Sequence, residues 1–254
     1  MSDLTKKPVV LSLAGTDAIA AQEDLAFTAT DGHPLAFDLY SPSEPGRPVV
    51  VFVSGFPDPG GKLKRMAAYP SWARLVAASG MAAVTYANRE PVADLSRLLA
   101  HLRHAALGVD GARVALWACS GNVPTALATL AHEPVVCAAL LYGYCLDDAS
   151  GALAQAAARF GFLAATRGLS LDDLPRALPL HLVRAGRDEM PGLNSTIDAL
   201  VAAALARDQP LGVDNVAGAP HAFDLIDDRD ASRAAIARVL AFLRCHLLGA
   251  IDRR

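Results

Sequence analysis

The stretch Val114-Ala115-Leu116-Trp117-Ala118-Cys119-Ser120-Gly121-Asn122-Val123-Pro124 joins a short apolar run to a turn of small residues that carries a hydroxyl group. The apolar run has the composition of a buried strand, and the alanine-rich segment 125–131 favours a helix. A sharp turn between a strand and a helix exposes a serine above a sheet and places helix N–H groups behind it. The stretch therefore predicts a strand–turn–helix unit with Ser120 at its turn.

The composition is that of a globular protein. The 254 residues suffice for one large α/β domain or two small ones with a sizeable core. Hydrophobic residues make up 53% of the chain and charged residues 19%, which argues against disorder. The 23 basic and 26 acidic residues form no basic stripe, and no apolar run reaches the length of a membrane span. Neither nucleic acid nor a membrane is expected as a partner, and the oligomeric state stays undetermined.

The cysteines and the N-terminus bear on the cellular compartment. The cysteines are Cys119, Cys137, Cys145 and Cys245. Their spacing fits neither a metal site nor a disulfide-stabilised small domain, so we interpret them as reduced thiols. Lys6-Lys7 precede an apolar segment, but Pro8 and Gly15 interrupt it, and Asp17 adjoins the sequence that imitates a signal-cleavage site. These features predict a cytoplasmic protein.

Strand-like and helix-like segments alternate along most of the chain. Residues 25–30 and 35–40 alternate in polarity around Asp31-Gly32, which predicts a hairpin. Further strands are expected at 48–53, 82–86, 114–117, 135–141, 180–185 and 211–216, and helices at 71–79, 91–107, after Ser120, at 193–206 and at 231–248. An antiparallel start followed by repeated strand–helix units predicts a mostly parallel sheet with helices on both faces.

The segment 147–178 is longer than an ordinary connection between two elements. It contains alanine-rich helical pieces together with Phe160 and Phe162. We interpret this segment as an insertion that forms a partial cap over the sheet, within a single domain that spans 1–254.

Ser120, Asp188 and His221 each follow a different strand of the predicted parallel sheet. Ligands bind beyond the carboxyl ends of the strands in such sheets. Taken alone, each residue has an ordinary explanation as a helix cap or a loop residue. Together they form a nucleophile, an acid and a base: an imidazole takes the proton of a serine hydroxyl, and a carboxylate orients the imidazole. Their chain order, serine, acid and histidine, favours this interpretation.

With these motifs the sequence resembles the α/β-hydrolase family and, within it, the dienelactone-hydrolase-like branch. The resemblance covers about 25–248 and rests on Ala118-Cys119-Ser120-Gly121-Asn122, Gly186-Arg187-Asp188 and Pro220-His221-Ala222-Phe223-Asp224. It implies an α/β-hydrolase fold and hydrolysis of a carboxylic ester or lactone, without a metal or organic cofactor. In this reaction Ser120 would form an acyl-enzyme, His221 would act as general base and then as general acid, and Asp188 would orient His221.

A second loop matches the family pattern of an oxyanion hole. Ser54-Gly55-Phe56-Pro57 follows the strand expected at 48–53. In that pattern, one N–H belongs to the residue after the loop glycine and the other to the residue after the nucleophile. By position these are Phe56 and Gly121. Ser54 stands where many relatives carry histidine, so the loop is a partial match.

The turn itself departs from the family pattern Gly-x-Ser-x-Gly. Ala118 and Asn122 occupy the glycine positions, where side chains crowd one another. Alanine adds only a methyl group, whereas Asn122 has to point its amide away from the turn, which we expect to be into the substrate pocket. This departure keeps a second hypothesis open, that of a catalytically impaired binding or scaffold protein with the same fold.

Several residues compete for the assigned roles. Cys119 adjoins the nucleophile position and is interpreted as a packed thiol. Cys145 lies in a sequence that resembles a cysteine elbow, but it follows the wrong strand and is rejected as nucleophile. Asp147 follows the strand at which some hydrolases place their acid, and it remains the alternative to Asp188. Glu189 should point elsewhere, and Asp224 is expected to be a local hydrogen-bond partner near His221.

The expected substrate pocket is assigned from residues at the strand ends. We expect Tyr144, Met190 and Asn122 to contact a small-molecule ester or lactone, with Phe56 and the 147–178 insertion also lining the pocket. Because the insertion is apolar and carries little charge, an uncharged acyl group of small or medium size is favoured.

Overall fold

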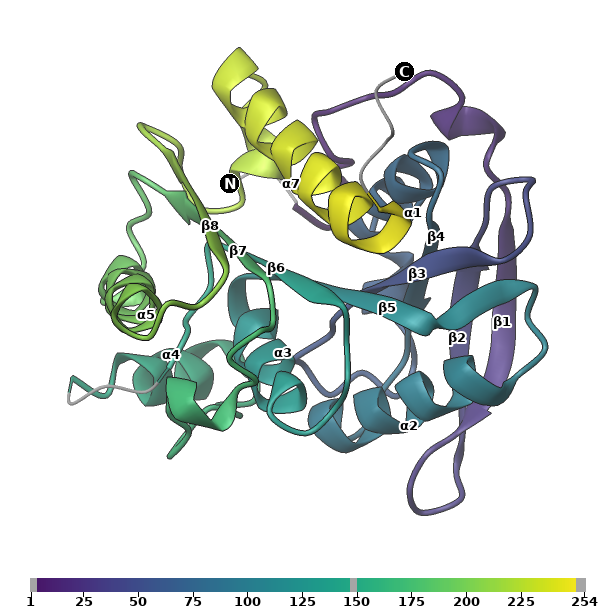
Figure 1. The fold of residues 1–254 in the computed structure, drawn as a ribbon, viewed down its shortest axis with the longest axis horizontal. Helices are drawn as coiled ribbons and strands as arrows, with labels where there is room; N and C mark the ends of the chain where they lie inside the picture. The colour runs from purple at the N-terminus through teal and green to yellow at the C-terminus, as the bar shows by residue number, and fades with distance from the viewer. Residues whose placement is uncertain (1–3, 147–149, 250–254) are drawn as a thin grey trace.

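The structure is a computed structural model that describes residues 4–146 and 150–249. Its centre is an eight-stranded sheet with the order β1-β2-β4-β3-β5-β6-β7-β8 (Figure 1). The strands are β1 (Ala21–Thr28), β2 (Pro34–Tyr40), β3 (Arg47–Phe52), β4 (Ala82–Tyr86), β5 (Val109–Cys119), β6 (Cys137–Leu141), β7 (Leu180–Ala185) and β8 (Leu211–Val216). Strand β2 is antiparallel to β1 and β4, and every other neighbouring pair is parallel. The predicted mostly parallel sheet is confirmed.

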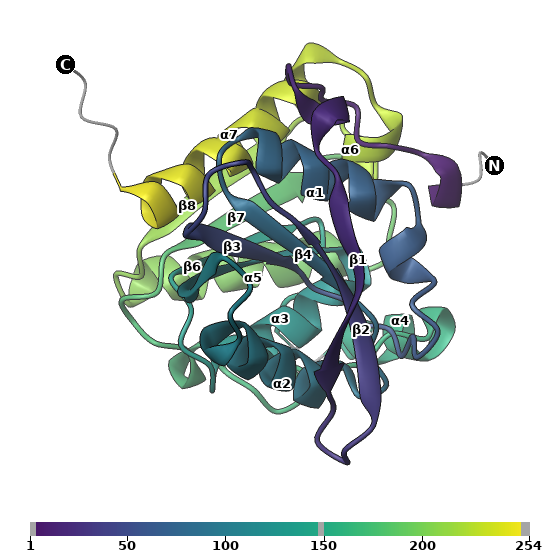
Figure 2. The same ribbon diagram turned by 90° about the vertical axis from the view of Figure 1, so that its right-hand side faces the viewer.

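Helices cover both faces of the sheet. They are α1 (Ala68–Ala78), α2 (Pro91–His104), α3 (Val123–Leu130), α4 (Ala152–Phe160), α5 (Leu193–Ala206), α6 (Phe223–Ile226) and α7 (Asp230–Leu248). Helices α1 and α7 lie on one face, and α2, α3 and α5 lie on the other (Figures 1 and 2). Each face has its own hydrophobic core.

Strand β3 shows why a valine run belongs at the centre of this sheet. Its side chains point alternately to the two faces, so Val49 and Val51 enter one core while Val50 and Phe52 enter the other. All four side chains are buried. An unbroken apolar run therefore supplies side chains to both cores, as expected for a parallel strand with helices on both sides.

The predicted elements exist, and some boundaries differ. Strands β4, β7 and β8 and helix α5 have the predicted limits. Strand β5 begins at Val109 rather than at residue 114, because its polar first part pairs with the start of β3. Helix α1 begins at Ala68, with Pro70 in its first turn, where a missing N–H costs no hydrogen bond. Helix α6 was not predicted.

Within segment 147–178, helix α4 and a short 3-10 turn (Leu171–Asp173) are the regular elements of the described residues. The segment contacts the loop after β3, since the Leu163 N–H donates a hydrogen bond of 2.9 Å to the Gly55 carbonyl. Residues 147–149 lie outside the described residues, and with them the alternative acid Asp147.

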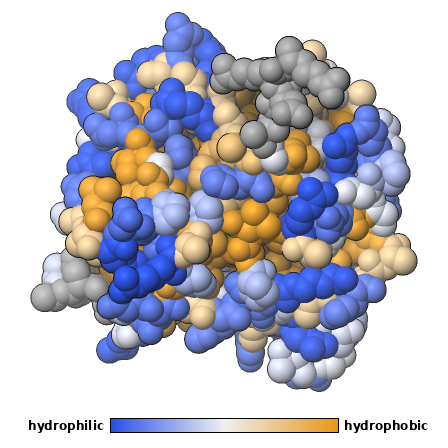
Figure 3. Space-filling view, in the orientation of Figure 1, coloured by the Kyte–Doolittle hydropathy of each residue, from blue (hydrophilic) through white to orange (hydrophobic). Residues whose placement is uncertain are grey.

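The molecular surface is mixed in polarity. On the face drawn in Figure 3, polar side chains occupy much of the periphery, and apolar residues are visible toward the centre. Exposed large hydrophobic residues include Leu4, Phe160, Leu163, Leu205, Val213 and Ile226, which come from several elements. Among residues 4–146 and 150–249, no helix combines the length and the hydropathy needed to cross a bilayer.

Candidate active site

Ser120 lies on a sharp turn between β5 and α3. It opens a short 3-10 turn (Ser120–Asn122) and has a φ of 56°, in the left-handed region that non-glycine residues rarely adopt. Gly143 allows the segment after β6 to pack closely against this turn. A Cβ atom on Gly143 would lie 2.5 Å from the Ser120 carbonyl oxygen and 2.3 Å from a methyl carbon of Val123. The predicted strand–turn–helix unit is therefore present, and its backbone strain is of the kind found at functional sites.

Ser120, His221 and Asp188 form a continuous hydrogen-bonded chain. Ser120 Oγ lies 2.8 Å from His221 Nε2, and His221 Nδ1 lies 2.7 Å from Asp188 Oδ2. Because a carboxylate only accepts, Nδ1 carries the ring proton and Nε2 accepts from the serine hydroxyl. The Asp188 side chain is 0% exposed and that of His221 is 27% exposed, so the imidazole is the part of the pair that solvent reaches. The Met190 N–H donates a 3.0 Å bond to Asp188 Oδ1 and fixes the carboxylate.

The loop after β3 lies directly against the serine turn. A Cβ atom on Gly55 would lie 2.5 Å from the Gly121 carbonyl oxygen, so only glycine permits this approach. Within the described part of the chain, no hydrogen-bond partner occupies the Phe56 N–H. The Gly121 N–H lies in the first turn of the 3-10 segment, where amides have no partner inside the helix. Both expected oxyanion donors are thus carried by backbone segments that contact each other.

The side chain of Asn122 does not point into the substrate pocket, where the sequence had led us to expect it. Its side chain is turned toward the protein, where Oδ1 accepts a 2.7 Å bond from the Gly55 N–H and Nδ2 donates a 3.2 Å bond to the Tyr69 hydroxyl of α1. The residue is 8% exposed. Both polar atoms of the amide are engaged by protein groups, so Asn122 connects the serine turn to the loop that carries Phe56 instead of presenting its amide to a substrate.

Aromatic side chains cover the region beside Gly121. The Phe162 and Phe56 rings pack edge to face, with centroids 5.9 Å apart, and the Phe162 ring is stacked on that of Tyr144 at 6.1 Å. A Cβ atom on Gly121 would lie 2.7 Å from the Phe162 ring. The 147–178 segment therefore contributes a specific residue, Phe162, to the site. The sequence alone does not identify Phe162, because only the folded path of the segment brings it to Gly121.

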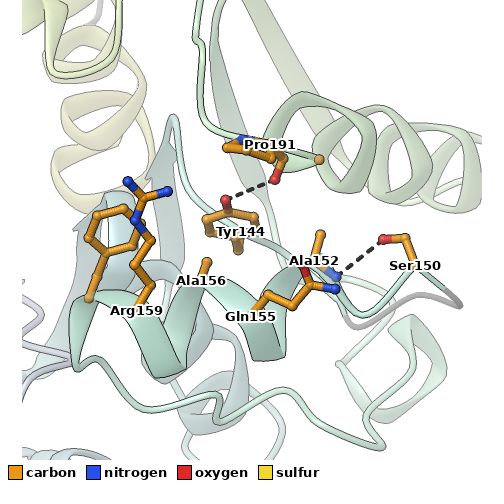
Figure 4. A pocket seen from close by; sticks show the side chains of 9 residues that line it. Tyr144, Ser150, Ala152, Gln155, Ala156, Arg159 and Pro191 are labelled. Atoms are coloured by element: carbon orange, nitrogen blue, oxygen red, sulfur yellow. Dashed lines mark hydrogen bonds between the residues drawn. The ribbon is translucent and has the colours of Figure 1, made fainter.

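Two cavities lie between helix α4 and the loop after β7. One has a volume of about 310 Å³ and is bordered by Tyr144, Pro191 and Arg159 (Figure 4). In it the Tyr144 hydroxyl donates a 3.0 Å bond to the Pro191 carbonyl, so helix α4 and the loop after β7 face each other across Tyr144. The other, of about 620 Å³, is bordered by His221 and Met190 and shares Arg159 and Pro191 with the first. The expected pocket residues Tyr144 and Met190 thus line neighbouring cavities.

The thiols of Cys119 and Cys145 are buried in the protein. Burial raises the pKa of the Cys119 thiol well above its ordinary value. Burial also raises the pKa of Cys145 to about 12, and its N–H donates to the Thr196 hydroxyl. A protonated, buried thiol is a poor nucleophile. Among the residues that the structure describes, no group of histidine, cysteine and acidic side chains is arranged to hold a metal ion.

Solved structures share this architecture over almost the whole chain. A bacterial heroin esterase is 19% identical with a TM-score of 0.70, and the match covers 94% of this chain and 87% of that one. A thermostable esterase from Pseudomonas putida ECU1011 is 19% identical with a TM-score of 0.68, covering 94% and 86%. An esterase from Pyrobaculum calidifontis is 16% identical with a TM-score of 0.69, covering 95% and 87%.

Sequence comparison adds no closer assignment, since no family model and no curated protein matches the chain. At these levels of identity, the structural likeness establishes the architecture only. The parallel sheet, the helices on both of its faces and the full-length match to these esterases show that the chain has the α/β-hydrolase fold.

Proposed function

We propose that the protein is a serine hydrolase that cleaves a carboxylic ester or lactone. The observation that carries the proposal is the hydrogen-bonded chain from Ser120 through His221 to the buried Asp188. It supplies a nucleophile, a base and an orienting carboxylate in contact distance, at the end of three parallel strands. The esterases of similar fold support the same reaction class.

The geometry suggests how each residue acts. Ser120 Oγ attacks the acyl carbon while His221 Nε2 takes its proton, and Asp188 stabilises the imidazolium that forms. The N–H groups of Phe56 and Gly121 bind the oxyanion of the tetrahedral intermediate. The intermediate then expels the alcohol, which receives the proton from His221, and leaves an acyl group on Ser120. A water molecule activated by His221 attacks this acyl-enzyme and releases the acid.

The finer assignments are part of the same proposal. On its motifs we place the chain in the dienelactone-hydrolase-like branch, as a single domain in which 147–178 is a partial cap. The substrate is a small-molecule ester or lactone with an uncharged acyl group, bound beside Tyr144 and Met190. A cytoplasmic location fits the buried free thiols of Cys119 and Cys145.

The alternative of an impaired scaffold protein loses its main argument. That argument was the large side chain of Asn122 in the serine turn. Since Asn122 accepts a bond from Gly55 and donates one to Tyr69, it supports the loop that carries the Phe56 N–H. A side chain with this role favours an active site over a degenerate one.

Labelling with a fluorophosphonate probe tests the proposal. We expect one adduct on wild-type protein and none on Ser120→Ala, detected by intact-protein mass spectrometry. Absence of a wild-type adduct, or an adduct that persists in Ser120→Ala, contradicts the assignment. With an aryl ester, His221→Ala and Asp188→Asn should each reduce kcat by about a thousandfold or more. If Asp147→Asn has this effect and Asp188→Asn does not, Asp147 is the acid.

A further inference from the structure

Asp224 is a buried carboxylic acid that the proposed reaction does not use. It lies in α6, close in sequence to His221, and its side chain is 0% exposed. Its Oδ1 accepts a 2.6 Å hydrogen bond from the Tyr142 hydroxyl. Its Oδ2 is buried and makes no hydrogen bond of standard geometry among the described residues, while the Trp72 side chain, whose indole N–H also lacks such a bond, helps to lower the pKa of this carboxyl group. A carboxyl group is costly to bury, so its presence here calls for a specific reason.

Tyr142 connects this carboxyl group to the proposed base. It follows β6, and its ring meets the His221 ring edge to face, with centroids 5.1 Å apart and planes at 73°. The Tyr142 N–H donates a 2.7 Å bond to the Val183 carbonyl of β7, so the backbone at this point is held by the sheet. The ring therefore stands between Asp224 and the imidazole, with its position fixed at both ends.

Three residues with strained backbone conformations lie close to the contact between Tyr142 and His221. Tyr142 has a φ of 36°, and Ser120 and Ala222 both have a φ of 56°. Such values cost free energy in residues other than glycine and persist where the surrounding structure imposes them. Here they lie at the nucleophile, at the aromatic support and next to His221. The strain thus coincides with the parts that set the position of the imidazole.

We propose that Tyr142 and Asp224 form a positioning pair that holds the His221 ring toward Ser120 and stabilises its protonated form. The proposal rests on the proposed function, because it assigns His221 as the group that gains a proton during the reaction. The hydroxyl bond to Asp224 fixes the Tyr142 ring, and the edge-to-face contact between this ring and His221 supports the imidazole. The pair acts through His221 and does not touch the substrate.

The charge of Asp224 adds to this effect. Burial raises the pKa of Asp224 to about 6, while the Tyr142 hydroxyl and the charge of His221 lower it. At pH 8, about two units above this value, the group is ionised. The titratable groups that face it are Tyr142, Cys119 at the end of β5, and His221. Burial keeps Tyr142 and Cys119 protonated and neutral, so an imidazolium at His221 is the cation that a carboxylate here favours.

Two variants separate this role from simple packing. Tyr142→Phe keeps the ring and removes the hydroxyl, and Asp224→Asn keeps the shape and removes the charge. Tyr40→Phe, which removes the hydroxyl of a buried tyrosine in β2, is the matched control. With an aryl acetate we expect kcat to fall about tenfold in both variants and KM to stay within about twofold, while the control is unchanged.

An NMR titration of the imidazole protons provides a readout that does not require turnover. We expect the His221 ring proton signals to respond to pH differently in Asp224→Asn and in wild type, because the substitution removes a carboxylate that interacts with the imidazolium. Loss of packing alone would lower the melting temperature without moving this titration. Tyr142→Phe carries the test if Asp224→Asn does not fold.

The outcomes distinguish the two proposals. If both folded variants keep the wild-type kcat and the wild-type His221 titration, the positioning pair is overturned, whether or not the protein is a hydrolase. If wild type forms no adduct with a fluorophosphonate but the His221 titration moves in Asp224→Asn, the hydrolase function fails and the coupling of the pair to His221 stands.

Discussion

Replacing Asn122 by alanine tests whether the amide supports the oxyanion hole. In the wild-type protein, the buried Gly55 N–H donates a 2.7 Å hydrogen bond to Asn122 Oδ1. The substitution leaves this N–H without an acceptor. Leaving a buried donor without a partner costs about 1–3 kcal/mol, and the loop can avoid this cost only by moving toward water. Such a move also displaces the N–H of the next residue, Phe56. One oxyanion donor contributes about 3–4 kcal/mol to transition-state stabilisation, which sets the upper limit of the loss.

At about 1.4 kcal/mol for each factor of ten, these values predict that kcat of Asn122→Ala falls by about tenfold to a hundredfold. KM should change little, because the hydrogen bonds of an oxyanion hole strengthen as the negative charge develops. Steady-state kinetics with an aryl ester of fixed acyl group measure both parameters. Circular dichroism confirms that the compared proteins are folded.

Two control variants dissect the Asn122 contacts. Asn122→Asp retains an oxygen acceptor for the Gly55 N–H, and the Tyr69 hydroxyl is able to donate to the new carboxylate. Tyr69→Phe removes only the outer contact, which is 3.2 Å long. Both should retain kcat within about threefold to fivefold of wild type. A folded Asn122→Ala protein with a kcat within about twofold of wild type would refute the support role.

Three further predictions concern stability, specificity and reactivity. Because burial raises the pKa of Asp224 from its ordinary 3.8 to about 6, the folded protein binds more protons than the unfolded chain between these values. The free energy of unfolding of the wild-type protein should therefore fall as pH rises from about 4 to about 6. In urea unfolding experiments, Asp224→Asn should be more stable than wild type at pH 8 but not at pH 4. Since Phe162 fills the space beside Gly121, Phe162→Ala should raise kcat/KM for hexanoyl esters relative to acetyl esters by about tenfold, and an unchanged chain-length profile in an aryl ester series would contradict this. Iodoacetamide should modify the exposed Cys245 and leave the buried Cys119 intact by peptide mass mapping, with ester turnover retained; inactivation through Cys119 would show that its thiol is reactive.

The location of the candidate site follows from strand direction. Strands β5, β7 and β8 are parallel members of one sheet, so the residues that follow them emerge at the same edge. For this reason Ser120, Asp188 and His221 were predictable as neighbours from their places along the chain. The apolar runs that identify the strands are a local property, and a local property can be read from sequence.

The supporting contacts were not predictable in the same way. Asn122 donates a hydrogen bond to Tyr69 of α1, and Tyr142, which follows β6, donates one to Asp224 of α6. The two residues are 53 positions apart in the sequence in the first contact and 82 positions apart in the second. Bulk at position 122 was evident from the sequence, but the direction of its side chain depends on a partner that only the folded chain supplies.

The glycines around Ser120 explain how a degenerate turn motif retains its geometry. In the usual pattern, glycines two positions before and after the serine relieve the crowding within the turn. Here Ala118 and Asn122 hold those positions, and the close approaches are made at Gly55 and Gly143. A Cβ atom at either would lie 2.5 Å from a carbonyl oxygen of the turn, that of Gly121 or that of Ser120. The requirement for glycine therefore belongs to the contact and not to the position in the motif, and a turn without its two glycines is not evidence of a lost activity.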